Sequence, residues 1–110
     1  MEYDYVRGDL LIDKFYRGLT NILYELYPFS KIEKYDNPTT DTMSITMDIY
    51  YKGKQCKLKQ DIDKPGMRYY LNGYYKDLLN DYTNRFQREI TKFIKETMED
   101  QGRIWGSEKI

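Results

Sequence analysis

The chain contains no histidine and only one cysteine, Cys56. Histidine is the side chain whose ordinary pKa lies nearest to neutral pH, and it is the commonest metal ligand. Without it, a serine or cysteine nucleophile lacks its usual general base, and a metal site depends on carboxylates alone. These absences favour a binding or structural role over catalysis. We therefore predict no enzyme activity, no metal and no cofactor.

Long hydrophobic runs are also missing from the sequence. No stretch approaches the roughly 20 apolar residues that a membrane helix needs, so we expect no membrane partner. A lone cysteine cannot form an intrachain disulfide, which favours a cytosolic location. At 110 residues the chain has the usual size of one domain. We predict a single domain over residues 1–110, with a core at about 9–99 and a tail at 100–110.

Acidic and basic residues are equal in number, 18 of each, but they are unevenly distributed. Residues 1–50 carry five basic and nine acidic residues, whereas residues 51–76 carry seven basic and two acidic ones. The remainder, residues 77–110, is close to neutral, with six basic and seven acidic residues. The middle of the chain is therefore a basic segment between acidic flanks.

Two segments have apolar residues at the three- and four-residue spacing of an amphipathic helix. The first runs from about Asp9, which is suited to cap a helix, to Tyr27, where Pro28 ends it. The second runs from about Tyr75 to Glu99 and is expected to end at Gln101-Gly102. Each predicted helix has one apolar stripe, and charged residues occupy its other faces.

Between the predicted helices the sequence favours strands. Apolar and polar residues alternate over residues 43–51, and a tight turn at Lys52-Gly53 leads into a return strand. In this hairpin Ile49 faces Cys56 and Met47 faces Leu58. A short strand is expected before it, at Lys31–Tyr35. Residues 67–73 remain ambiguous between a helical turn and an edge strand.

The predicted order of elements is α-β-β-β-α. Two amphipathic helices need an apolar surface, and the sheet offers one on a single face. We therefore predict an α+β fold, a two-layer sandwich in which both helices pack on one face of an antiparallel sheet. Met47, Leu58 and Phe86 then point into the core, while Lys57 and Lys59 point away from it.

Most reactive side chains have a structural interpretation. Cys56 alternates with Lys57, so it points inward and acts as a small apolar residue. Asp61 and Asp63 share a strand face, but lysines flank them and no further acidic cluster is near, so a metal site is not predicted. The stretch 50–76 interleaves lysines with tyrosines, a pattern that suits either phosphates and bases or a protein interface.

We predict that the functional surface is drawn mainly from this stretch. Exposed tyrosines bury a large area at low entropic cost, and they are frequent at contact hot spots. The single tryptophan lies in the C-terminal tail. The candidate interaction residues are Tyr50, Lys57, Lys59, Arg68, Tyr69, Tyr75 and Trp105.

The element order also matches double-stranded-RNA-binding domains, whose second helix opens with a lysine cluster. The corresponding residues here are Tyr74-Tyr75-Lys76-Asp77, so that phosphate clamp is missing. A second resemblance covers Leu10 to Tyr51, where a helix is followed by Tyr27-Pro28-Phe29, Ile32-Glu33-Lys34-Tyr35 and the strand 43–51. This part resembles the opening of tail-completion or tail-terminator subunits of tailed phages. The resemblance implies a ring-forming virion subunit without catalysis.

These observations lead to a ranking of functions. The first is a non-enzymatic structural protein of a phage or mobile element, which works by protein–protein contact as a homo-oligomer or in a larger assembly. The second is a small phage-encoded inhibitor or adaptor that binds a host protein. The third is a nucleic-acid-binding module that uses the basic stretch. The expected location is the host cytoplasm or the virion.

Overall fold

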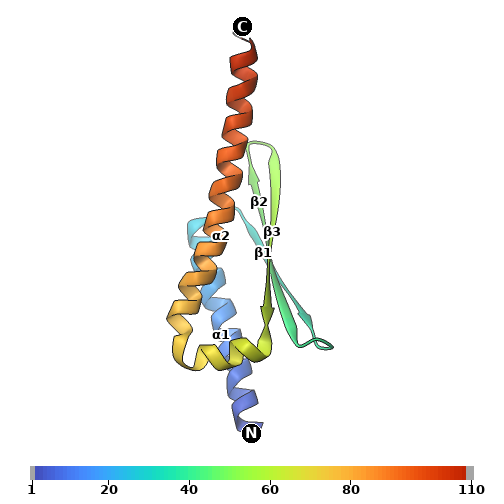
Figure 1. Ribbon diagram of the computed structural model, residues 1–110, viewed down its shortest axis with the longest axis vertical. Coiled ribbons are helices and arrows are strands. Elements are labelled where there is room, and N and C mark those ends of the chain that lie inside the picture. The colour runs from blue at the N-terminus through green and yellow to red at the C-terminus, as the bar shows by residue number, and fades with distance from the viewer. Residues whose placement is uncertain (1, 109–110) are drawn as a thin grey trace.

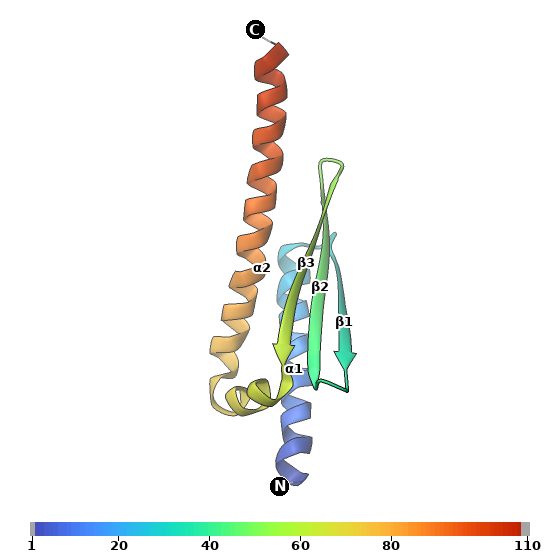
Figure 2. The same cartoon turned by 45° about the vertical axis from the view of Figure 1, so that its right-hand side comes forward.

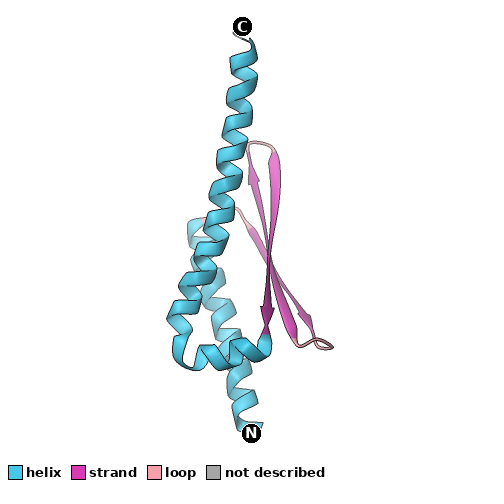
Figure 3. Cartoon of the chain, in the orientation of Figure 1, coloured by secondary structure: helices cyan, strands magenta, loops and turns pink. Residues whose placement is uncertain are grey.

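The computed structural model describes the backbone of residues 2–108 and the side chains of residues 9–99. Both helices lie on one side of the sheet (Figure 1), and colouring by secondary structure separates the two layers (Figure 3). This confirms the predicted α+β fold and its α-β-β-β-α order. The elements are α1 (Glu2–Leu26), β1 (Lys31–Asn37), β2 (Thr42–Tyr51), β3 (Lys54–Asp63) and α2 (Lys64–Glu108).

The strands form an antiparallel sheet in the order β1-β2-β3. The hairpin between β2 and β3 has the predicted register, because Ile49 pairs with Cys56 and Met47 with Leu58. Its two turn residues have positive φ angles, 50° at Lys52 and 79° at Gly53. Such angles are typical of the tight turn whose twist matches that of the strands it joins.

The core lies between the helices and the inner face of the sheet. Alternation along β2 buries every second residue, and Met47 is completely inaccessible to solvent. Phe86 of α2 is equally inaccessible, and Leu58 of β3 keeps only 8% of its surface exposed. The inward orientation predicted for these three residues is confirmed. Burial of such side chains contributes about 1.5–3 kcal/mol each relative to exposure.

The helices pack closely against each other near Gly18. A Cβ atom at Gly18 would lie 2.8 Å from the hydroxyl oxygen of Tyr75, so only glycine permits this approach without a shift. The Tyr75 hydroxyl donates a hydrogen bond to the carbonyl of Lys14 at 3.1 Å. The Phe15 ring packs edge-on against the rings of Tyr75 and Tyr82. Aromatic packing therefore joins α1 to α2 directly.

Several predicted boundaries differ from the structure. Helix α1 begins at Glu2 rather than near Asp9, so Asp9 lies inside the helix and does not cap it. The first strand extends beyond Tyr35 to Asn37. Helix α2 continues to Glu108, past Gln101-Gly102, which the sequence predicted to be its end.

The long part of the second helix begins after Tyr74, as predicted, but a further helical segment precedes it within α2. It starts at Lys64, so the ambiguous residues 67–73 are helical. The Gly66 N–H lies 3.4 Å from the Asp63 carboxylate, the position of a helix cap, and Pro65 is tolerated in a first turn. Met67 and Leu71, one turn apart, are 5% and 2% exposed. Their burial provides the packing that stabilises this short segment.

A bend at Tyr74, with φ −126° and ψ 31°, separates residues 64–73 from the long part of α2. We call this bend and residues 64–73 the elbow. Beyond it, α2 runs back along β3 and β2 and continues past the hairpin turn (Figure 1). The structure is accordingly elongated, with extents of 69 × 27 × 20 Å.

The helix layer is displaced towards one edge of the sheet. In Figure 2, α2 lies beside the β3 edge, whereas β1 forms the opposite edge and no helix ribbon lies beyond it. The burial along β1 agrees with this placement, because Ile32 is its one buried residue and Lys34 and Asp36 are exposed. Neither helix in the described chain has a segment apolar enough to cross a lipid bilayer.

Candidate functional site

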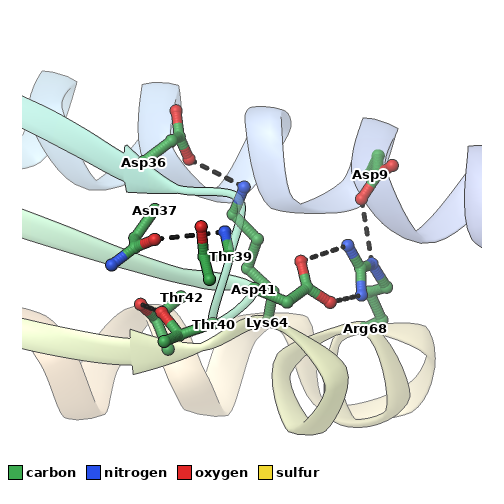
Figure 4. Close-up of polar contacts among 9 residues, drawn as sticks. All are labelled: Asp9, Asp36, Asn37, Thr39, Thr40, Asp41, Thr42, Lys64 and Arg68. Atoms are coloured by element: carbon green, nitrogen blue, oxygen red, sulfur yellow. Dashed lines mark hydrogen bonds and ion pairs between the residues drawn. The ribbon is translucent and has the colours of Figure 1, made fainter.

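An ionic cluster joins the elbow to α1 and to the turn between β1 and β2. The Arg68 guanidinium donates two hydrogen bonds to the Asp41 carboxylate, at 2.6 and 3.0 Å, and a third to Asp9 at 2.9 Å. Figure 4 shows these contacts, with Asp9 projecting from α1 and Asp41 from the turn. The Arg68 side chain is only 16% exposed. Three segments distant in sequence therefore meet at one buried guanidinium.

A second ion pair completes the cluster. Lys64, at the start of α2, contacts the Asp36 carboxylate of β1 at 2.8 Å, and its side chain is 18% exposed. We call Asp9, Asp36, Asp41, Lys64 and Arg68 the Arg68 cluster. A cavity of about 180 Å³ opens between these residues and the side of α1.

The protonation of the cluster follows from its contacts. Hydrogen bonds from Arg68 hold the pKa of Asp41 below its usual range, and the Arg68 charge lowers it further. Hydrogen bonds to Asp41 in turn raise the pKa of Arg68 above its already high ordinary range. Asp41 and Arg68 are therefore both charged at neutral pH, and neither is poised as a general acid or base.

The cluster accounts for part of the uneven charge distribution of the sequence. Asp9, Asp36 and Asp41 belong to the acidic first half, and their partners Lys64 and Arg68 belong to the basic middle. At this cluster the acidic and basic segments thus neutralise each other inside one fold. No group of three or more metal-ligating side chains occurs among residues 9–99. We assign the Arg68 cluster to stabilisation of the fold.

The lone thiol is half-buried on the inner face of β3. Burial raises the pKa of Cys56, and the nearby carboxylates of Glu89 and Glu96 on α2 raise it further. A thiol with a raised pKa is mostly protonated at neutral pH and is a poor nucleophile. The position of Cys56 agrees with its predicted role as a packing residue.

Some of the predicted interaction residues lie on the outer face of the sheet. Lys57 and Lys59 alternate along β3, and the exposed Tyr50 lies on neighbouring β2. Acidic residues are interspersed with them, because Lys57 pairs in register with Asp48, and Lys59 lies 3.6 Å from Asp61. The hydroxyl of Ser44 also donates to Asp61, at 2.6 Å. This face therefore has mixed charge.

The other predicted interaction residues lie elsewhere. Arg68 belongs to the ionic cluster, and Tyr75 is half-buried between the helices, so neither forms part of the outer face. Tyr69 lies at the elbow and is 76% exposed. Trp105 lies outside the residues whose side chains are described. The predicted residues that are described do not form one surface.

An aromatic cluster at the elbow was only partly identified from the sequence. Tyr70 and Tyr74 are 52% and 57% exposed. The centroid of the Tyr70 ring lies 5.3 Å from the centroid of the Tyr69 ring and 6.4 Å from that of the Tyr74 ring. We call these three residues the elbow tyrosines. The signal that could have identified them is their spacing, since positions 70 and 74 are one helical turn apart.

Comparison of the chain with protein-family models, with curated proteins and with solved structures gave no significant match.

Proposed function

We propose that this protein acts without catalysis, by contact with other proteins, as a subunit of a larger assembly. The observation that carries the proposal is the group of elbow tyrosines, whose rings pack on one another and remain 52–76% exposed. Tyrosine adds a large apolar area and a polar tip to an interface, and it loses little side-chain entropy on binding. We further propose a phage or mobile-element assembly, with the protein in the host cytoplasm or the virion.

The distribution of charge supports this proposal over nucleic-acid binding. A phosphate-binding surface needs several cations that act together on one face. Lys64 and Arg68, two of the basic residues in the central segment, contact carboxylates of the same chain. Lys57 and Lys59 lie beside Asp48 and Asp61 on the outer face. These four basic residues, all within the described part of the chain, are therefore balanced by neighbouring carboxylates and do not form a basic patch with the elbow tyrosines.

Site-specific photo-crosslinking tests the proposal. A photoreactive aromatic amino acid replaces Tyr69, and the chain is expressed in cells that naturally carry its gene. We expect a discrete protein adduct that is lost when Tyr70 and Tyr74 are both changed to Ser. Asn84 of α2, which is also exposed, is the matched control position and should give no such adduct.

The mass of the adduct distinguishes the two protein-contact roles. Adducts that extend into a ladder indicate an assembly subunit, whereas a single one-to-one adduct with a host protein indicates an inhibitor or adaptor. Equal crosslinking at positions 69 and 84 would show that the elbow tyrosines have no selective partner. That result would contradict the proposal.

A further inference from the structure

We infer that the free edge of β1 pairs with β1 of a second copy of this chain. The two strands run antiparallel about a two-fold axis at Tyr35, so that one continuous sheet crosses both copies. This inference names one partner for the protein-contact role proposed above and rests on it. The backbone groups, the charges and the open space at this edge indicate that the partner is a second copy of the chain.

The backbone of β1 presents hydrogen-bonding groups along the open edge. In an antiparallel sheet, the N–H and C=O groups of alternate residues point to the same side of a strand. The Ile32 N–H donates to the hydroxyl of Tyr24 at 2.9 Å, so the Ile32 backbone faces away from β2. By the same alternation, the backbone groups of Lys34 and Asp36 also face the open edge. Tyr24 caps the edge at Ile32, which leaves the Lys34–Asp36 segment to pair with a strand.

The charges along β1 favour a symmetric register about Tyr35. A two-fold axis at Glu33, Lys34 or Asp36 would place each of these charged residues opposite itself, which is destabilising. An axis at Tyr35 instead places Lys34 opposite Asp36 of the second copy, and this pair occurs twice. A two-fold axis that lies between two neighbouring residues of β1, instead of at one residue, would put inner-face residues opposite outer-face residues. Of the axes centred from Glu33 to Asp36, only the one at Tyr35 therefore places opposite charges against each other.

The same axis aligns the outer face. Glu33 lies opposite Asn37 of the second copy, a carboxylate opposite an amide that can donate to it. The two Tyr35 rings meet at the axis, and each ring is 55% exposed in the single chain. Aromatic residues directly opposite each other stabilise antiparallel strand pairs.

The existing contacts of Lys34 and Asp36 are compatible with this pairing. The Lys34 ammonium lies 5.0 Å from the centroid of the Tyr16 ring and remains exposed. The Asp36 carboxylate contacts Lys64 through Oδ1 at 2.8 Å, and its side chain is 45% exposed. A carboxylate can accept several hydrogen bonds, so Asp36 can bind Lys64 and a second lysine together.

The opposite edge of the sheet shows why β1 is selected. The outer face of β3 is also self-complementary, because Lys57 and Lys59 precede Asp61 and Asp63. However, α2 lies beside the β3 edge (Figure 2), and a two-fold there would bring the helix layers of the two copies into the same space. At the β1 edge, α1 reaches the strand through side chains, Tyr24 at Ile32 and Tyr16 beside Lys34, and Figure 2 shows no helix ribbon beyond β1.

Disulfide trapping tests the predicted axis. In a background with Cys56→Ser, the variant Tyr35→Cys places one cysteine on the axis. Residues opposite each other in such a non-hydrogen-bonded pair have Cα atoms about 4.5 Å apart, within the roughly 4.4–6.8 Å that a disulfide requires. We expect a disulfide-linked dimer under mild oxidation. Tyr50→Cys is the matched control, since Tyr50 is more exposed, at 65%, but lies on β2 away from this edge.

A mixed pair tests the register. Glu33→Cys and Asn37→Cys chains, separately tagged and combined, should form the mixed disulfide in preference to either symmetric dimer. This test also serves if Tyr35→Cys fails to fold. Equal trapping through Tyr35→Cys and Tyr50→Cys, or no preference for the mixed dimer, would overturn the inference.

Light scattering on the unmodified chain tests the association without a crosslink. We expect a concentration-dependent dimer, and we expect Lys34→Asp to raise its dissociation constant by about tenfold or more, because two attractive pairs become repulsive. Lys59→Asp, on the outer face of β3, should leave the constant unchanged. A strict monomer at every concentration would overturn the inference. Persisting adducts at position 69 in that case would leave the proposed function intact.

Discussion

The apolar core and the Arg68 cluster both join the helices to the sheet, but they use opposite chemistry. In the core, Phe86, Met47 and their neighbours are removed from water, and dispersion and the hydrophobic effect hold the layers together. In the cluster, one guanidinium holds carboxylates from two other segments. The core interactions supply most of the free energy of folding, whereas the ion pairs of the cluster orient the elbow. We therefore expect the core and the cluster to respond differently to mutation and to pH.

Truncation in the core has the largest expected effect. Phe86→Ala removes a side chain with no exposed surface, and we expect the free energy of unfolding to fall by about 3–5 kcal/mol. Urea denaturation followed by circular dichroism measures this change. Phe86→Leu should cost less and serves as the measurable variant if Phe86→Ala does not fold. A loss below about 1 kcal/mol for Phe86→Ala would show that the core is not centred on this residue.

Removal of the guanidinium should have an intermediate effect. Arg68→Met keeps much of the side-chain volume but leaves Asp9 and Asp41 without their partner, at an expected cost of about 1–3 kcal/mol. Arg17→Met is the matched control, because Arg17 is 74% exposed and pairs with Asp13 one turn away on the surface of α1. We expect less than about 1 kcal/mol there. Equal losses in the same denaturation experiment would mean that the Arg68 cluster behaves as an ordinary surface pair.

Acid should affect the cluster and leave the core contribution unchanged. Hydrogen bonds from Arg68 lower the pKa of Asp41 in the folded state, so the ionised carboxylate stabilises the fold. This contribution is complete above the unfolded pKa of about 4 and disappears as the pH falls through the lower folded pKa.

The matching variant is Asp41→Asn, which suits the positive φ of 51° at this position because asparagine tolerates that conformation. We expect this variant to lose part of the acid dependence of stability, whereas Phe86→Leu keeps all of it. Unfolding measured between pH 2 and 7 compares the slopes. If the free energy of unfolding has the same dependence on pH in wild type and in Asp41→Asn, then Asp41 does not contribute to the acid dependence of stability.

The smallest effect is expected on the outer face of the sheet. Lys59 is 61% exposed and lies 3.6 Å from an exposed Asp61, so Lys59→Ala should change stability by no more than about 0.5 kcal/mol. This variant gives the baseline against which the core and the cluster are compared. A loss above about 1 kcal/mol would assign the outer face a structural role comparable to that of the cluster.

Much of the fold was predictable because its signals are local. Alternation along β2 and the Lys52-Gly53 turn predicted the hairpin register, and the structure has the same pairing. Helical spacing likewise predicted the central parts of both helices. The boundaries were less predictable, because Asp9 and Pro65-Gly66 resemble end signals when their distant contacts are unknown. Asp9 contacts Arg68, and the packing of Met67 and Leu71 stabilises the segment after Pro65-Gly66.

The candidate surface was predicted less well than the fold. Residue type alone placed Arg68, Tyr69 and Tyr75 in one interface. In the structure, these neighbours in sequence lie in an ion-pair cluster, on the exposed elbow and between the helices. Helical periodicity separates adjacent side chains by about 100°, so a cluster in sequence need not be a cluster in space. Only the direction of the helix after β3 decides which side chain is buried.

Outside residues 64–73, the sequence by itself determined the element types, the hairpin register and the main core positions, because these depend on local spacing and on the need to bury apolar surface. Only the tertiary structure decided how the charges are used. Arg68, which the sequence suggested as part of a binding surface, forms ion pairs within the fold, since folding brings Asp9 and Asp41 to it. Tertiary packing also decides that the elbow tyrosines and the β1 edge are exposed, because the helices do not cover them.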